Sequence, residues 1–128
     1  IVPGASGLCS SHGSLHGNSM TLEQGEEGNA YYTIHIGGEG LGKVSYQVYR
    51  IRNIMHRLPM PEEEKLPMPE GLNVSIEPTN FITRNFMDYT SKITVKTGPE
   101  LARGEYILCI DVETSGMLTY ELLTVNAI

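Results

Sequence analysis

The sequence predicts an all-β protein, organised as a seven-stranded antiparallel β-sandwich. Two observations carry this prediction. Short segments alternate apolar β-branched or aromatic residues with polar residues, and clusters of Gly, Pro and Ser separate these segments. Alternation with a period of two is typical of strands that bury one face, and no segment carries the apolar stripe of an amphipathic helix.

Each predicted strand has one apolar face, which must be buried against another such face. Two packed antiparallel sheets are the usual solution. The seven predicted strands are residues 20–22, 30–36, 44–48, 72–76, 89–96, 106–112 and 118–125.

The beginning of the chain lacks this alternation. Residues 1–18 are rich in Gly and Ser, so we expect a flexible N-terminal tail, with the domain formed by residues 19–128. Residue 1 is Ile, so we expect that a signal peptide was removed or that the chain was cut from a longer protein. The Gly-rich stretch 37–42 precedes a strand, which predicts a hairpin loop and not a phosphate-binding loop.

Composition excludes several classes of function. The chain has 128 residues, of which 40% are hydrophobic, and this is enough for one domain with a buried core. Its net charge of −6 disfavours binding to nucleic acid or to an anionic membrane. No apolar run is long enough to form a transmembrane segment. No pairing of a nucleophile with a base stands out, so we expect neither an enzyme nor a bound cofactor.

The turn before the sixth predicted strand has a recognisable form. Gly98-Pro99 ends one strand, Gly104 permits the return of the chain, and Tyr106 begins the next strand. This is the place of a tyrosine corner, in which the ring packs in the core and the hydroxyl bonds to nearby backbone. We therefore expect Tyr106 to be buried with its hydroxyl satisfied.

A Pro-rich segment at 56–71 interrupts the strand pattern. Proline cannot donate to a sheet, and the repeated sequence Leu-Pro-Met-Pro at 58–61 and 66–69 predicts a connection outside the sheets. A solvated crossover is the simpler interpretation. The alternative is a binding loop for another protein or for a second copy of this chain, in a homo-oligomer. Its candidate binding residues are Leu58, Met60, Leu66 and Met68.

Two parts of the chain resemble a known group of domains. The first is "SMTLEQGEEGNAYYTIHI", and the second is "LNVSIEPTNF" followed by "YTSKITVKTGPELARGEYILCIDV". Over about residues 19–126, the sequence is similar to Ig-like modules of archaeal and bacterial secreted or cell-envelope proteins. The resemblance implies an Ig-like fold and a non-catalytic structural or interaction module, with a protein or a cell-surface polymer as partner. The antibody-type disulfide is absent, since Cys9 precedes the first predicted strand.

A metal site is the first alternative function. Cys9, His12 and His16 lie within eight residues, and sulfur and imidazole are ligands for zinc or copper. A Gly/Ser tail holds no fixed geometry, so we expect no metal there. A copper-handling domain would add methionine ligands from Met55, Met60 and Met68.

Four further residues are candidates for binding or modification. Exposed Tyr31 and Tyr49 would serve a carbohydrate-binding module. Asn73 begins the glycosylation sequon Asn-Val-Ser. Cys109 should face away from the core or lie at a sheet edge, where it would form a disulfide with Cys9 or remain a free thiol.

Overall fold

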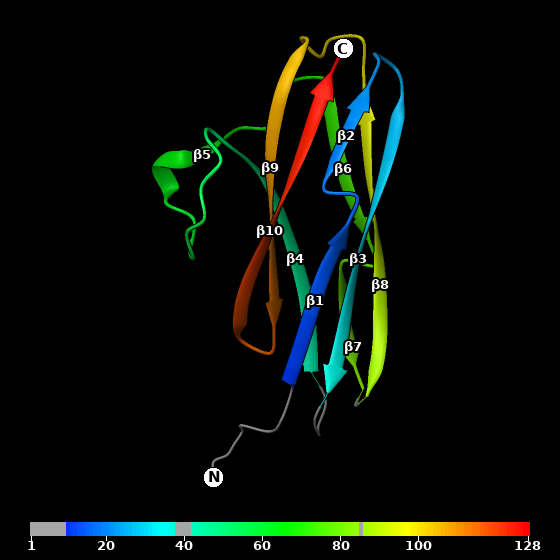
Figure 1. The fold of residues 1–128 in the computed structure, drawn as a ribbon, viewed down its shortest axis with the longest axis vertical. Helices are drawn as coiled ribbons and strands as arrows, with labels where there is room; N and C mark the ends of the chain where they lie inside the picture. The colour runs from blue at the N-terminus through cyan, green and yellow to red at the C-terminus, as the bar shows by residue number, and fades with distance from the viewer. Residues whose placement is uncertain (1–9, 38–41, 85) are drawn as a thin grey trace.

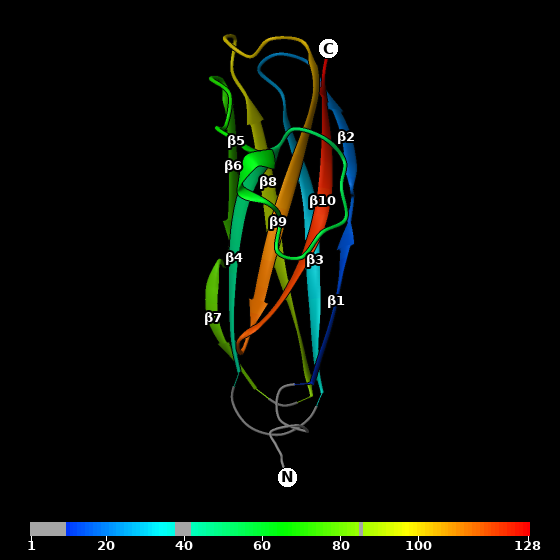
Figure 2. The same ribbon diagram turned by 90° about the vertical axis from the view of Figure 1, so that its left-hand side faces the viewer.

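The computed structural model describes residues 10–37, 42–84 and 86–128. The fold is an elongated sandwich of two β-sheets (Figure 1; Figure 2). Within the described residues it has ten strands and one short 3-10 turn, η1, at Glu62–Glu64. The prediction of an all-β, Ig-like sandwich is confirmed, but the number of strands is ten and not seven.

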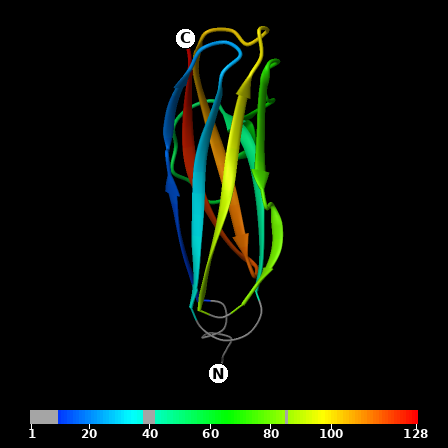
Figure 3. The same cartoon turned by 90° about the vertical axis from the view of Figure 1, so that its right-hand side faces the viewer.

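One sheet has four strands, all antiparallel, and is seen face-on in Figure 3. Its strands in spatial order are β1 (Ser10–His16), β3 (Glu27–Gly37), β8 (Met87–Thr97) and β6 (Leu72–Glu77).

The other sheet has six strands, and only its pair β2–β10 is parallel among the described pairs. Strand β7 (Asn80–Thr83) pairs with one end of β4. The remaining strands in spatial order are β2 (Ser19–Leu22), β10 (Met117–Ala127), β9 (Gly104–Thr114), β4 (Gly42–Ile51) and β5 (Lys65–Leu66).

The core lies between the two sheets and is made by alternate residues of the facing strands. In β3, four alternating residues are buried while their neighbours on the same strand are more exposed. The same alternation recurs in β8, which packs beside β3. The largest fully buried side chains between the sheets are Ile34, Ile36, Ile93, Leu101, Leu108, Ile110 and Leu123. This is the burial that period-two patterning predicts.

All seven predicted strands are present, as β2, β3, β4, β6, β8, β9 and β10. The expectation of a tail over residues 1–18 is wrong for its last part, because Ser10–His16 form β1 and pair with β3 from end to end. Only Gly13 and Leu15 of the central part of β1 face inward beside core residues of β3, so the strand shows no apolar alternation. Most of the predicted hairpin loop 37–42 lies outside the described residues; the strands on either side of it, β3 and β4, belong to different sheets and do not pair with each other.

The chain passes from one sheet to the other between β1 and β2. Gly17 has a φ of 90°, a left-handed conformation that favours glycine, and it turns the chain out of the four-stranded sheet. The carbonyl of Asn18 then accepts a hydrogen bond of 3.0 Å from the amide of Thr124 in β10. One N-terminal segment therefore forms an edge strand in both sheets.

Tyr106 has the geometry of a tyrosine corner, as predicted. Its side chain is 7% exposed, and its hydroxyl donates a hydrogen bond of 2.6 Å to the carbonyl of Ala102. The guanidinium carbon of Arg50 lies 5.0 Å from the centre of the ring, which adds a cation–π contact. The hydroxyl thus ties the loop before β9 to the core.

We expect Tyr106→Phe to lower the free energy of unfolding by about 1–2 kcal/mol, because the part-buried hydrogen bond from its hydroxyl to Ala102 is lost. Tyr106→Ala should cost about 3–5 kcal/mol, because a large core side chain is also lost. Urea denaturation of the three proteins measures both values. Losses near zero for both variants would show that the corner does not stabilise the fold.

Candidate functional site

The connection between β4 and β6, which contains the Pro-rich segment 56–71, lies against the outer face of the six-stranded sheet, the face turned away from the main core. Its first part, residues 52–64, is here called the cover loop, and Figure 2 shows it in front of β9 and β10. Met60 is 4% exposed and packs with Ile51 and Cys109, both almost fully buried. The residues around this second cluster are Tyr49, Met55, Ile107, Tyr120 and Leu122. The cover loop therefore closes a small second core.

The four residues predicted to bind a partner have different environments. Met60 is buried in the second cluster, and Met68 packs against the main core. Leu66 is half-buried in β5. Only Leu58 presents an exposed apolar side chain, with 51% of its surface accessible. The repeated Leu-Pro-Met-Pro motif is therefore mainly used for covering the fold.

A polar network borders this second cluster. The Tyr49 hydroxyl donates a hydrogen bond of 2.9 Å to Oδ1 of Asp111, and the Cys109 thiol lies 3.6 Å from the same oxygen. The ammonium of Lys65 lies 4.6 Å from the centre of the Tyr49 ring and forms an ion pair of 2.6 Å with Glu62. The hydroxyl and one ring face of Tyr49, a predicted carbohydrate contact, thus make contacts within the domain.

The chemistry of Cys109 follows from its burial. It faces away from the main core, as predicted, but lies in a central strand beneath the cover loop and is 0% exposed. Burial raises the pKa of its thiol to about 11. The thiol is therefore protonated near neutral pH, whereas a nucleophilic cysteine must be a thiolate. Cys9 lies outside the described residues, so the pairing of the two cysteines stays a prediction.

Strand β10 has an open edge along more than half its length. Strand β2 pairs only with Thr124–Ala127, whereas β9 pairs with all of β10. The segment Met117–Leu123 has no strand on its other side among the described residues, and Figures 1 and 2 show it diverging from β1. We call this segment the open edge.

The register shows which backbone groups point outward from the open edge. The amide of Thr124 points toward the β2 side, where it bonds to Asn18. In an antiparallel pair, alternate residues direct their N–H and C=O groups to the same side of the strand. Leu118, Tyr120 and Leu122 therefore direct their backbone groups away from β9. These residues present three backbone N–H donors and three C=O acceptors with which another strand can pair.

The outer side of the open edge has a small pocket. Nδ1 of His56, in the cover loop, lies 3.1 Å from the hydroxyl of Tyr120, and the two rings are 6.1 Å apart. The pocket has a volume of about 410 Å³. It is lined by Asn18, His56, Tyr120, Glu121 and Leu122. It thus begins where β2 leaves β10 and the open edge starts.

The inner side of the open edge carries a carboxylate. Glu121 is half-buried and lies opposite Ile110, a core residue, so its side chain is directed between the sheets. Burial raises the pKa of this carboxyl above its ordinary value. The hydroxyl of Tyr32 lies nearby, against Gly13 of β1, where a larger residue than glycine would overlap it. Burial raises the pKa of Tyr32 to about 12. An acidic group therefore borders the gap between the sheets.

The predicted metal ligands do not converge. His12 and His16 are exposed on β1, and four residues of extended strand separate them by about 13 Å. Their third predicted partner, Cys9, lies outside the described residues. Across residues 10–37, 42–84 and 86–128, no group of three or more His, Cys, Asp or Glu side chains has the arrangement of a metal site.

The other predicted residues lie on the four-stranded sheet. Tyr31 is 43% exposed on its outer face, beside the exposed Lys92. Asn73 is exposed on the edge strand β6, so its amide is accessible, and its glycosylation stays a prediction. No helix in the described part of the chain is long and apolar enough to cross a membrane.

Sequence reasoning missed the open edge and Glu121. Glu121 is the one charged residue in the predicted strand 118–125, and its place in the alternation puts it on the same face as Leu123 and Val125. That pattern was a usable signal of a carboxylate directed toward the core. The open edge had no such signal, because it arises from the difference in length between β2 and β10.

Comparison with known proteins gives a fold but no family. No family model matches the chain, and no curated protein matches it in sequence. Among solved structures it is similar to PapD-like domain 7 of human CEP192, with a TM-score of 0.60 and 15% identity over 91% of this chain and 84% of that one.

Two other solved structures share the architecture. The Escherichia coli chaperone DraB matches with a TM-score of 0.52 and 16% identity, over 94% of this chain and 55% of that one. A family 123 glycoside hydrolase from Clostridium perfringens matches with a TM-score of 0.67 and 10% identity, over 93% of this chain but only 27% of the hydrolase. At these identities the likeness shows the fold alone: the chain is an Ig-like β-sandwich similar to PapD-like domains.

Proposed function

We propose that this chain is a non-catalytic protein-interaction module that accepts an extended segment of a partner protein along the open edge of β10. The observation that carries the proposal is the set of outward backbone groups at Leu118, Tyr120 and Leu122. A partner strand that pairs with these groups continues the six-stranded sheet. Main-chain hydrogen bonds then give affinity, and side chains at alternate positions give specificity.

The fold neighbours support an interaction role. One is the chaperone DraB, another is a class 5 fimbriae chaperone, CfaA, and a third comes from a complex of a chaperone with a tip adhesin. The complete burial of Cys109 beneath the cover loop also argues for a structural rather than a chemical use of this residue. Together these observations favour binding over catalysis.

The open edge defines the chemistry of the partner. On the outer side, the half-buried side chains of Leu118 and Leu122 favour apolar residues of the incoming strand. On the inner side, Glu121 favours a Lys or Arg, since an opposite charge offsets the cost of burying its carboxylate. The net charge of −6 attracts the same basic partner over a longer range. The expected ligand is an extended, partly apolar segment with a basic residue.

We also propose a secreted or cell-envelope setting for the module. Two fold neighbours whose descriptions name fimbriae support this setting: the class 5 fimbriae chaperone CfaA and the chaperone–tip adhesin complex of CFA/I fimbriae biogenesis. An exposed sequon at Asn73 on an edge strand also supports it. Fractionation of the native cells with an antibody to this domain tests the proposal, and recovery in the cytoplasm alone would refute it.

Leu118→Pro should block the open edge, because proline removes the outward N–H and places its ring there. Leu118→Ala is the matched control, since it loses the same side chain and keeps the N–H. Peptides selected from a displayed library with the wild-type domain should bind Leu118→Ala somewhat more weakly, because its apolar contact is lost. They should bind Leu118→Pro about tenfold more weakly than Leu118→Ala, or worse, because the outward N–H is lost as well. Titration calorimetry measures the affinities, and thermal melts confirm that both variants fold.

Hydrogen exchange locates the peptide independently. A bound strand should slow the exchange of the amides of Leu118, Tyr120 and Leu122. Protection confined to the cover loop or to the four-stranded sheet would contradict the proposal, as would equal binding by both Leu118 variants.

Glu121→Gln should stabilise the domain at neutral pH. Burial raises the pKa of Glu121 in the folded state, so the carboxylate opposes folding once the pH exceeds that pKa. The advantage of the variant should therefore shrink toward about pH 3, where the carboxyl is protonated in both folded and unfolded chains. Thermal melts at both pH values measure the difference.

The exposed Glu113 on β9 gives the matched control. Glu113→Gln should leave both the melting temperature and the affinity for basic peptides nearly unchanged, whereas Glu121→Gln should weaken that affinity. Equal behaviour of the two variants would remove Glu121 from the binding edge.

A further inference from the structure

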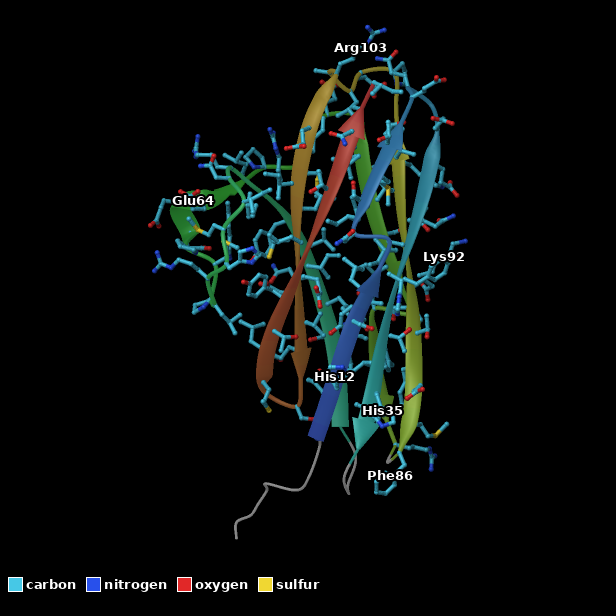
Figure 4. The ribbon with its side chains drawn as sticks, viewed as in Figure 1. His12, His35, Glu64, Phe86, Lys92 and Arg103 are labelled. Carbon is cyan, nitrogen blue, oxygen red and sulfur yellow. The ribbon has the colours of Figure 1, made fainter. Side chains whose placement is uncertain are left out.

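A row of three polar side chains crosses the outer face of the four-stranded sheet. His12 of β1 pairs directly with His35 of β3, and His35 pairs directly with Asp88 of β8. All three residues are exposed. Figure 4 labels both histidines, on neighbouring strands near one end of the sheet. Side chains directly opposite each other in such a pair have Cβ atoms about 4.5–5.5 Å apart.

The carboxylate of Asp88 fixes the histidine beside it. Nδ1 of His35 is hydrogen-bonded to Oδ1 of Asp88, so the ring donates its Nδ1 proton to the carboxylate. The lone pair of Nε2 is then available. A histidine that binds a metal usually has this arrangement, with its second nitrogen held by a carboxylate that orients the ring and raises its basicity.

The imidazole of His12 supplies a second nitrogen. Two imidazoles at directly paired positions can approach one ion at the usual Zn–N distance of about 2.0–2.1 Å. Because His12 is exposed, its side chain can turn toward His35 without displacing packed neighbours. Imidazole nitrogen suits Zn²⁺ and Cu²⁺, whereas Mg²⁺ and Ca²⁺ require oxygen ligands.

We propose that His12 and His35 together bind one Zn²⁺ or Cu²⁺ ion, with Asp88 as the carboxylate that orients His35. Water completes the coordination, since the row supplies two protein nitrogens. The ion cross-links the edge strand β1 to its neighbour β3. These ligands differ from the set Cys9, His12 and His16 that the sequence suggests, because they come from two neighbouring strands and not from one continuous segment.

His16 provides an internal control on the same strand and the same face. It lies opposite Tyr31, and Oγ of Ser14 is 3.2 Å from its Nε2. It therefore has the chemistry of His12 without an imidazole opposite. Any nonspecific affinity of exposed histidine for metal should be equal at the two positions.

The test is calorimetric titration of the full chain with Zn²⁺, Cu²⁺ and Mg²⁺. It is done in a Cys9→Ser background, which removes the thiol that is the third candidate ligand from the sequence. We expect one Zn²⁺ or Cu²⁺ per chain and no binding of Mg²⁺. His12→Ala and His35→Ala should each abolish the site, and His16→Ala should retain it. Asp88→Asn should weaken the affinity about 10-fold to 100-fold.

Hydrogen exchange tests the cross-link itself. Zn²⁺ should slow the hydrogen exchange of the β1 amides in the Cys9→Ser protein. It should not change the exchange of these amides when His12→Ala is added. Absence of Zn²⁺ and Cu²⁺ binding in the Cys9→Ser chain would overturn the proposal. Binding that survives His12→Ala or His35→Ala, or that is lost equally in His16→Ala, would also overturn it. Melting temperatures without metal establish that each variant is folded.

Discussion

The passage of the chain from one sheet to the other at Gly17 and Asn18 is the constraint on which the rest of the structure depends. Before it, β1 closes one edge of the four-stranded sheet, and after it, β2 closes one edge of the six-stranded sheet. A single short segment cannot cover both edges completely. The uncovered part of β10 is the direct result, so the feature proposed to bind a partner follows from how the two sheets are joined.

Both faces of the six-stranded sheet carry buried residues, which are covered by different parts of the chain. The inner face packs against the four-stranded sheet, and the cover loop closes part of the outer face over Cys109. Strand β9 is therefore buried on both sides near its centre, which accounts for its continuous apolar run Tyr106–Ile110. Packing on both sides makes this strand a rigid support for the open edge beside it.

Much of the fold was predictable because seven strands have one apolar face each, and Tyr106 stands in a recognisable corner. Strand β1 was not, since its run SSHGSLH has Leu15 as its one apolar residue and therefore no alternation. Met60 was expected in an exposed connection, because local sequence does not show that a distant sheet has an uncovered apolar face. The pairing of His12 with His35 likewise depends on register between strands, which no single segment contains.

The parallel pairing of β2 with β10 has a mechanical consequence. Strand β1 begins at one pole of the sandwich and β10 ends at the other, as Figure 1 shows. Tension between these two points pulls β2 and β10 in opposite directions along their common axis. The hydrogen bonds from Thr124 to Asn18 and from Ile128 to Leu22 then carry the load together, in shear, and are not broken one after another.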